Sequence, residues 1–486
     1  MKNYTILICC LVFVIAVGVY SLYGFEGKFF GDDALMMYSG QQMADGAPPY
    51  VSTFYNLAPV GPMIMGLGVM LSRMIGVDDF ITVRVLFFYI GCLTVVSIYL
   101  LCRYLLDSIR AGLFGAFAFL GFYGFAERSA SGPRDKTAMA LFQTLGLYFL
   151  CRKKWFWAGV FTALAFCSWQ PMGIYPLLAL VLALAQPGRQ RWSALGRCLA
   201  GIAAPMSVVL GYFIYHGALG DLIDGSIIFI IRYFPMSDTT FFTQIITIFQ
   251  GSGGILPVFG LCMIVYLYIW RYGQNKSLIK TLFRDDFAPL LISFPFPVFW
   301  SAFLDFRGYD DFFVFLPYVM VGFAKMLDLI IVQIESMDLN HKRLTRIMSV
   351  IFCFALVCIA AMSIRFNRNT RLIEQKQAVA EIERRFGADC RMIAIDVPQP
   401  LVFLHKTNPT RYVYAFFHFD RWIHDHTPGG FDGWLEELDA YQADVVIYGN
   451  NPCTYADKIR KWLTANFASD QIGPWLVFYR ASGGTK

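Results

Sequence analysis

The chain is built from long apolar runs separated by short polar or basic segments. Many of these runs approach the length at which a helix crosses a bilayer, about 20 residues. The predicted spans are approximately 4–23, 80–102, 110–126, 137–151, 155–170, 172–186, 196–215, 252–270, 287–304, 312–331 and 347–364. The pattern therefore predicts a polytopic transmembrane helix bundle with about eleven spans. The first run follows Lys2 and ends without a small-residue cleavage site, so we expect it to stay as an uncleaved signal anchor.

Segment 57–76 decides how the chain is threaded through the membrane. It is apolar, but two prolines and four glycines interrupt it. If it spanned, the basic run at 151–154 would lie outside, against the positive-inside rule. If it lies in the outer interface, all the basic blocks fall inside. These blocks are 103–110, 152–154, 189–197, 271–284 and 341–346. We therefore expect an interfacial helix here, with the amino terminus inside and the carboxyl terminus outside.

The tail, 365–486, has a different pattern and predicts a small α/β domain outside the membrane. The stretches 391–404 and 443–450 are typical of strands that end in turn residues. The stretches 374–386 and 455–467 are typical of amphipathic helices. The predicted fold class is therefore mainly α, with a transmembrane domain over 1–364, whose first outer loop is 24–79, and a C-terminal α/β domain over 365–486.

Composition supports the membrane assignment. Of the 486 residues, 57% are hydrophobic and 15% are charged, and the mean hydropathy is +0.53. A soluble domain carries about 25% charged residues. The net charge of +6 is small and falls in the short blocks between spans, so we expect membrane lipids as partners and no nucleic acid. Of the 12 cysteines, only Cys390 and Cys453 lie in the tail. They could form a disulfide bond with each other if the tail is exported.

Asp32 and Asp33 are the first candidates for chemistry. They follow the first span and precede a helical stretch in the first outer loop. A carboxylate at the lipid–water boundary could take a proton from an acceptor there. The alternative is structural: Asp32 caps a helix that begins near Ala34, and Asp33 adds favourable charge at its amino end.

Further candidates lie at the same face. Asp135 opens the fourth predicted span between Arg134 and Lys136, and it either takes part in chemistry or belongs to an interfacial ion cluster. Arg84 lies about one turn inside the second span, where it either snorkels outward or binds an anion. Arg307 has the same two alternative roles as Arg84, and three nearby acids could also simply neutralise its charge.

In this order, the motifs resemble those of the GT-C superfamily. These are glycosyltransferases that use polyprenyl-phosphate sugars, and they include protein O-mannosyltransferases and lipid A aminoarabinose transferase. The matching segments are the acidic pair Asp32-Asp33, the turn 46–50, the proline-containing helix 58–74, Arg84, Asp135, and the loop 306–312 with Pro317 after it. The sequences 408–412 (NPTRY) and 305–312 (DFRGYDDF) look most similar to archaeal-type dolichyl-phosphate-mannose mannosyltransferases. Many relatives have Asp-Glu where this chain has Asp32-Asp33, which leaves open which acid is the base.

The resemblance implies an integral membrane glycosyltransferase of the cytoplasmic membrane. It would move a sugar, mannose-like by preference, from a polyprenyl-phosphate donor to a glycan, lipid or protein acceptor on the outer face, with inversion. Asp32 or Asp33 would be the base, and Asp135 would support it or position the acceptor. Arg84, with Arg134 or Arg307, would hold the donor phosphate. The resemblance requires no cofactor, and a divalent metal stays open.

Two other function classes remain open. A transporter or flippase of lipid-linked saccharides would carry charged residues along its spans. A membrane-anchored binding protein would do its work through the tail alone. The tail also contains His418, His424 and His426 in a Gly-, Pro- and Trp-rich stretch, which we interpret as a long surface loop that contacts a ligand more readily than a metal.

Overall fold

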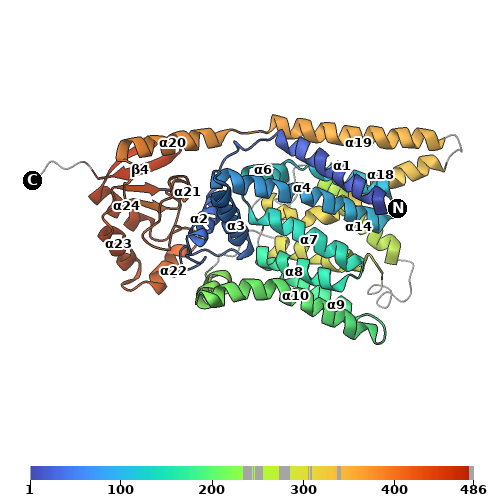
Figure 1. The fold of residues 1–486 in the computed structure, drawn as a ribbon, viewed down its shortest axis with the longest axis horizontal. Helices are drawn as coiled ribbons and strands as arrows, with labels where there is room; N and C mark the ends of the chain where they lie inside the picture. The colour runs from blue at the N-terminus through green and yellow to red at the C-terminus, as the bar shows by residue number, and fades with distance from the viewer. Residues whose placement is uncertain are drawn as a thin grey trace, which may run out of the picture.

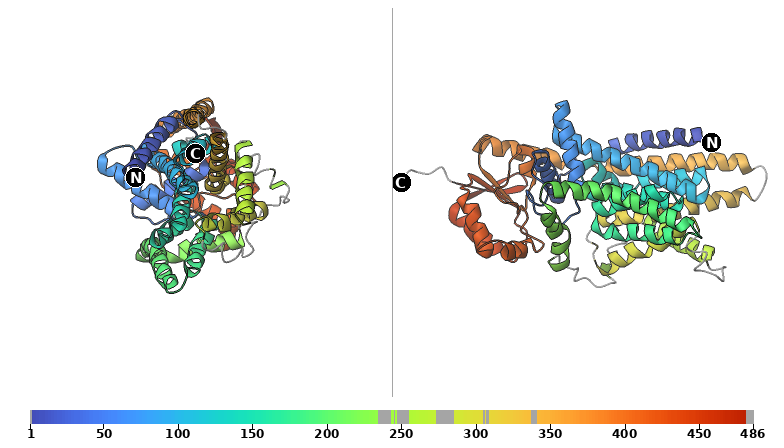
Figure 2. Two further views of the ribbon diagram at one scale, coloured as in Figure 1. Left: turned by 90° about the vertical axis from the view of Figure 1, so that its right-hand side faces the viewer. Right: turned by 60° about the horizontal axis from the view of Figure 1, so that its bottom comes forward.

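The computed structural model describes residues 2–233, 243–244, 246, 255–272, 285–304, 306, 309–336 and 341–480. The molecule is elongated: a helix bundle forms one part and an α/β domain lies at its end, with α2 and α3 between them (Figure 1). The two turned views keep this arrangement (Figure 2). Mainly α architecture with a small C-terminal sheet, as predicted, is confirmed.

The bundle contains helices that are apolar on several faces, as expected for segments solvated by lipid. Its main helices are α1 (Lys2–Ser21), α4 (Asp79–Leu106), α5 (Ile109–Leu120), α6 (Tyr123–Ser131), α7 (Asp135–Cys151), α8 (Trp155–Ser168), α9 (Ile174–Leu184), α10 (Gln190–Tyr215), α14 (Ile255–Tyr272), α16 (Ala288–Ser293), α17 (Pro295–Phe303), α18 (Leu316–Glu335) and α19 (His341–Phe366). Shorter turns are η1 (Gln170–Gly173), α11 (Leu219–Ile223), the π turn η2 (Asp224–Ile228), α12 (Phe229–Arg232) and η3 (Tyr309–Phe315). Every predicted span coincides with at least one of these helices.

Within the described residues, 5 helices are long and apolar enough to cross a membrane alone. The pair α5 and α6 would count as a sixth span, but it bends by 66° between Leu120 and Tyr123. The sequence pattern also predicts a short outer loop over 127–135 after the span 110–126, and this prediction was wrong in detail. Because α6 continues to Ser131, Arg128 projects from a helix and not from a loop.

Segment 57–76 forms the 16-residue helix α3 (Val60–Ile75), which pairs with α2 (Gly31–Ala44). The pair lies at the end of the bundle that faces the α/β domain, where α3 packs against α4 (Figures 1 and 2). The glycines that interrupt the segment make this pairing close. A Cβ on Gly40 would lie 2.9 Å from the backbone nitrogen of Gly66, so neither position can carry a side chain without moving the helices.

The C-terminal domain is a four-stranded sheet with helices on it. The strand order is β1-β2-β4-β3, where β1 (Met392–Ile395) and β2 (Val445–Tyr448) are parallel and the other pairs are antiparallel. The remaining strands are β3 (Ala468–Ile472) and β4 (Trp475–Tyr479), and the helices are α20 (Arg371–Phe386), α21 (Gln399–Leu404), α22 (Phe419–His426), α23 (Gly430–Ala440) and α24 (Ala456–Asn466).

Three details of the tail differ from the sequence prediction. Residues 399–404 form helix α21 and not the end of a strand, because Pro398 and Pro400 favour a helix start over a ladder position. The stretch around His424 forms α22 and α23 and not a long loop. The hairpin of β3 and β4 was not predicted.

The tail and the first loop share one hydrophobic core, which joins residues such as Phe54 in the loop to Trp422 and Val446 in the tail. Polar contacts fix the docking. Gln375 of α20 accepts from the backbone nitrogen of Phe29 and donates to its carbonyl, both at 2.9 Å. The NPTRY motif takes part as well, since the backbone N–H of Asn408 donates to the Tyr38 hydroxyl at 2.9 Å. The α/β domain is therefore packed directly on the loop that carries Asp32 and Asp33.

Candidate functional site

Asp32 and Asp33 lie in the first turn of α2. The helix begins at Gly31, and its N-cap residue, Phe30, makes no side-chain cap. The interpretation of Asp32 as a cap of a helix near Ala34 was therefore wrong, because Asp32 is already inside the helix. Both carboxylates still lie where the helix dipole favours negative charge.

Arg134 holds the two acids together. Its Nη1 lies 3.0 Å from Oδ2 of Asp32 and 3.2 Å from Oδ1 of Asp33. Its Nε lies 3.6 Å from Oδ1 of Asp135, and its Nη2 lies 3.4 Å from Oδ2 of Asp310. One guanidinium thus contacts four carboxylates from three separate segments of the chain.

Two further cations complete this acid–base cluster. Arg128 of α6 binds Oδ1 of Asp310 through Nε at 2.8 Å and lies 3.8 Å from Asp33. Lys136 binds Asp311. The cluster joins five acids to three bases: Asp32, Asp33, Asp135, Asp310 and Asp311 with Arg128, Arg134 and Lys136. The loop before Pro317 was expected at this site, and Asp310 and Asp311 bring it there.

Exposure separates Asp32 from the other acids of the cluster. The Asp32 side chain is 48% exposed, whereas that of Asp33 is fully buried and that of Asp135 is 1% exposed. Burial raises the pKa of Asp33 to about 7, although Arg134 and Arg128 act against this rise. Desolvation also raises the pKa of Asp32, but the charges of Arg134, Lys136 and Arg128 outweigh it and leave the pKa below its usual value. At neutral pH, Asp32 is therefore ionised and can be reached from outside the protein.

Asp135 lies behind this pair. Its Oδ1 accepts from the backbone nitrogen of Lys136 at 2.8 Å. Its Cβ is 3.2 Å from the position a Cβ would take on Gly61 of α3. The flanking cations do not snorkel into solvent, because Arg134 and Lys136 are each only 11% exposed. Asp135 is thus part of a buried ion cluster that positions Arg134.

Arg84 is fully buried beneath the loop and does not face the cluster. Its Nη1 and Nη2 donate to the carbonyls of Phe25 at 2.5 Å and Gly27 at 3.1 Å. Its guanidinium lies 4.3 Å from the ring centre of Phe80. These contacts fix the chain that leads to α2. Arg307, the other predicted phosphate ligand, lies outside the described residues.

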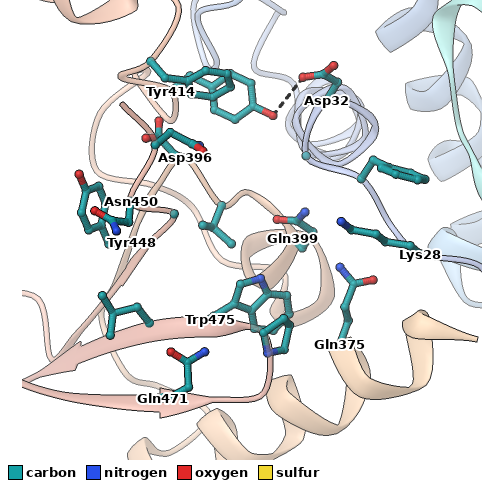
Figure 3. A pocket seen from close by; sticks show the side chains of 18 of the residues that line it. Lys28, Asp32, Gln375, Asp396, Gln399, Tyr414, Tyr448, Asn450, Gln471 and Trp475 are labelled. Carbon is teal, nitrogen blue, oxygen red and sulfur yellow. Dashed lines mark hydrogen bonds between the residues drawn. The ribbon is translucent and has the colours of Figure 1, made fainter. Parts of the chain in front are cut away.

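A cavity of about 610 Å³ lies between the cluster and the C-terminal domain. Asp32, Lys28, Arg128 and Arg134 line one side of it. Figure 3 shows Asp32 and Lys28 on this side, and Asp396, Tyr448 and Trp475 on the other. The hydroxyl of Tyr414 bridges the two sides, since it donates to Oδ1 of Asp32 at 3.4 Å.

The tail's contribution to this cavity was missed in the sequence. Asp396 directly follows β1, and Gly449, Asn450 and Asn451 directly follow β2. Because the carboxyl ends of neighbouring parallel strands meet at one edge, polar residues just after two strands are the signal that could have indicated this site.

The three histidines of the tail do not converge. Nδ1 of His418 contacts the carbonyl of Tyr233 at 2.6 Å, His424 accepts from the backbone nitrogen of Phe431, and His426 stacks on Trp422. In the described part of the chain, no group of three or more His, Cys, Asp or Glu side chains is arranged to hold a metal ion. Cys390 and Cys453 are both free thiols.

The fold is similar to two solved membrane proteins. ArnT from Cupriavidus metallidurans in the apo state aligns with a TM-score of 0.61 and 13% identity, over 99% of this chain and 98% of that one. Its form bound to undecaprenyl phosphate gives 0.58 and 12%, over 99% of each chain. The archaeal oligosaccharyltransferase AglB from Archaeoglobus fulgidus, in complex with an inhibitory peptide and a dolichol-phosphate, gives 0.57 and 12%, over 100% of this chain and 75% of that one.

No family model and no curated protein matches the sequence. The identities are too low to carry function, but the alignments extend over the helix bundle and the tail together. The chain therefore shares its overall fold with these two proteins, in agreement with the fold expected from the motifs.

Proposed function

We propose that this chain is a membrane glycosyltransferase that moves a sugar from a polyprenyl-phosphate donor to an acceptor hydroxyl outside the cytoplasmic membrane. The observation that carries the proposal is the pairing of Asp32, the exposed acid of the cluster, with Arg134 at the mouth of a cavity. The two structures of the same fold that are described with undecaprenyl phosphate or dolichol-phosphate support the class of donor. A mannose-like sugar is a proposal from the sequence resemblance alone.

Asp32 would act as the general base. Its carboxylate takes the proton of the acceptor hydroxyl as the acceptor oxygen attacks the anomeric carbon. The bond from that carbon to the phosphate oxygen breaks, and the polyprenyl phosphate leaves with the electron pair. The product carries one new glycosidic bond, and Asp32 returns the proton to water.

Inversion is the expected stereochemistry. A retaining enzyme needs a second carboxylate that reaches the sugar as a nucleophile. The other acids of the cluster are at most 10% exposed and already face Arg128, Arg134 or Lys136. With only Asp32 open to the cavity among these acids, a single displacement is favoured.

Arg134, Arg128 and Lys28 would stabilise the donor phosphate. All three line the cavity beside Asp32, and a guanidinium fork suits a phosphate group. A phosphate bound to Arg134 would also place negative charge next to Asp32. Such a charge raises the pKa of a carboxylate, so donor binding would make Asp32 a stronger base. Asp33 and Asp135 would hold Arg134 in place, and Arg84 would fix the loop.

The test is a transfer assay with the purified protein in lipid nanodiscs. Radiolabelled polyprenyl-phosphate mannose and other polyprenyl-phosphate sugars are offered with membrane extracts as the source of acceptor. Label that moves to a glycan, lipid or protein supports the proposal. Movement of intact donor across vesicles that contain the protein, without transfer from any donor, would instead support the flippase.

A further inference from the structure

The cavity has two ends of different chemistry. The end at Asp32 carries the cations Lys28, Arg128 and Arg134. The end formed by the C-terminal domain carries amides, a phenol beside the one of Tyr414 that bridges the two sides, and an indole; these come from Gln399, Asn450, Asn451, Gln471, Tyr448 and Trp475. Figure 3 shows Gln399 and Trp475 near the middle of the cavity and Gln471 on the hairpin. Among the described residues of the C-terminal domain, no lysine or arginine lines the cavity, although Arg460 donates to Asn450 at 2.9 Å.

Asp396 is the acid at the second end, and it is held there at an energetic cost. It is 7% exposed and has a left-handed backbone with a φ of 64°, which few residues other than glycine adopt readily. Its Oδ1 accepts from the backbone nitrogen of Ala415 at 2.7 Å. Its Oδ2 is buried without a hydrogen bond of ordinary geometry among the described residues, although the backbone N–H of Phe416 and the side chain of Asn451 also favour the charged carboxylate. A buried polar atom without a partner is unfavourable, so a ligand that satisfied it would bind more tightly.

The surrounding backbone keeps Asp396 in this position. Its backbone nitrogen donates to the carbonyl of Val413 at 2.7 Å. Gly449, which follows β2, approaches so closely that an added Cβ would lie 2.9 Å from the Cβ of Asp396. The carboxyl ends of β1 and β2 thus build one edge, and such edges are where ligands bind in parallel sheets.

We propose that this end of the cavity binds an uncharged saccharide that belongs to the acceptor. Sugar hydroxyls both donate and accept hydrogen bonds, as do the amides of Asn451 and Gln471. The apolar face of a sugar ring can pack on an aromatic side chain such as Trp475. The proposal rests on the proposed function, because it assumes that the acceptor hydroxyl is attacked beside Asp32.

A charged acceptor fits this end less well. An anionic sugar would meet the carboxylate of Asp396, and the nearby cation Arg460 is already engaged, since it donates to Oδ1 of Asn450 at 2.9 Å and 3.2 Å. An extended peptide would gain most from a strand edge, which β3 offers along its side and not at the carboxyl ends of β1 and β2. An uncharged glycan uses the amides and the indole together.

The test measures sugar binding directly, without donor, on the full-length protein in nanodiscs. The probes are tritiated mannotriose and maltotriose, a glucuronic acid trisaccharide, a glucosamine trisaccharide and a serine-containing peptide. We expect an uncharged trisaccharide to bind, and the glucuronic acid trisaccharide and the peptide to bind at least about tenfold more weakly. The glucosamine trisaccharide, whose ammonium groups could donate to Asp396, tests whether the ligand is uncharged, and we expect it to bind less tightly than the uncharged trisaccharides.

Two variants place the binding in this cavity. Asp396→Asn keeps the shape but changes the hydrogen bonding of Oδ2, and Gln471→Ala removes an exposed amide of the hairpin. The matched control is Gln442→Ala. Gln471 and Gln442 each donate through Nε2 to a nearby backbone carbonyl, at 2.9 Å and 2.8 Å, but Gln442 does not line the cavity. Both cavity variants should weaken trisaccharide binding by about tenfold, and the control should not.

The outcomes separate this inference from the proposed function. Equal binding in wild type and both cavity variants, or tighter binding of a charged sugar or the peptide, would each overturn it. Such results leave the transfer assay untouched. Conversely, if trisaccharide binding depends on the cavity residues but no sugar is transferred, the saccharide site is supported and the proposed glycosyltransferase activity is contradicted. Thermal unfolding of each variant shows that the fold is retained.

Discussion

One nitrogen of Arg134, Nη1, lies 3.0 Å from Asp32 and 3.2 Å from Asp33, so a single group joins an exposed acid to a buried one. The buried acid and its neighbours keep the arginine fixed, and the arginine keeps Asp32 ionised. This relationship assigns different tasks to two adjacent residues of the same type.

Arg134 should be needed for the fold as well as for transfer. Arg134→Gln would leave the buried Asp33 and Asp135 short of positive charge, and loss of one partner in a buried ion pair costs about 3–5 kcal/mol. The control is Arg73→Gln, because Arg73 forms an exposed pair with Asp45 that contributes about 0–1 kcal/mol. The melting temperature in nanodiscs should fall clearly for the first variant only. Equal small shifts would show that the cluster does not depend on Arg134.

Much of this arrangement could be predicted from the sequence, and the limits are physical. The apolar runs identified the bundle helices because length and hydropathy suffice for that purpose. The helix α3 was expected from the sequence, although the glycine contact between Gly40 and Gly66 was not. Which of Asp32 and Asp33 faces outward could not be predicted, because successive residues of a helix point in different directions and the neighbours decide which is covered.

The way in which the tail docks on the first loop could not be predicted from the sequence either. The strands and amphipathic helices of the tail were visible as local patterns, but its docking on the first loop depends on contacts between distant segments, such as Gln375 with Phe29. The cavity and Asp396 arise only from that docking. The contacts of Arg84 could not be predicted for a similar reason, since the carbonyls that it binds belong to a loop far from it in the sequence.

Arg84 should prove to be a positioning residue. Both Arg84→Gln and Arg84→Lys lose one or both hydrogen bonds to the carbonyls of Phe25 and Gly27, so both should lower the melting temperature. The KM for the polyprenyl-phosphate donor should stay within about twofold in the folded fraction, because Arg84 does not line the cavity. The contrary result is a raised donor KM in Arg84→Gln that Arg84→Lys restores, without loss of stability in either variant. It would show that Arg84 binds the donor phosphate.

Asp396 should make stability depend on pH. Burial raises the pKa of Asp396 to about 7, although the backbone N–H groups of Ala415 and Phe416 lower it. The unfolded chain has the ordinary pKa, near 3.8. Between these two values the folded state binds more protons than the unfolded state, so this group makes the protein less stable as the pH rises from about 4 to about 7.

Asp396→Asn removes that titration. The difference in melting temperature between the variant and the wild type should therefore shift in favour of the variant by a few degrees between pH 4 and pH 7.5, whatever its value at pH 4. Asp432→Asn is a suitable control, because Asp432 is exposed and paired with Lys458 in the same domain. A difference that stays constant with pH in the Asp396 variant would contradict the raised pKa.

The most direct measurement of the central claim compares Asp32→Asn with Asp45→Asn in the transfer assay. The two acids belong to the same loop and are similarly exposed, at 48% and 53%, and each pairs with an arginine, at 3.0 Å and 2.7 Å. They differ in that only Asp32 lines the cavity. Loss of a general base costs about 10²–10⁴-fold in rate, so Asp32→Asn should lower kcat by at least about 100-fold while Asp45→Asn stays within about twofold. Equal rates in the two variants would contradict the assignment of Asp32 as the base.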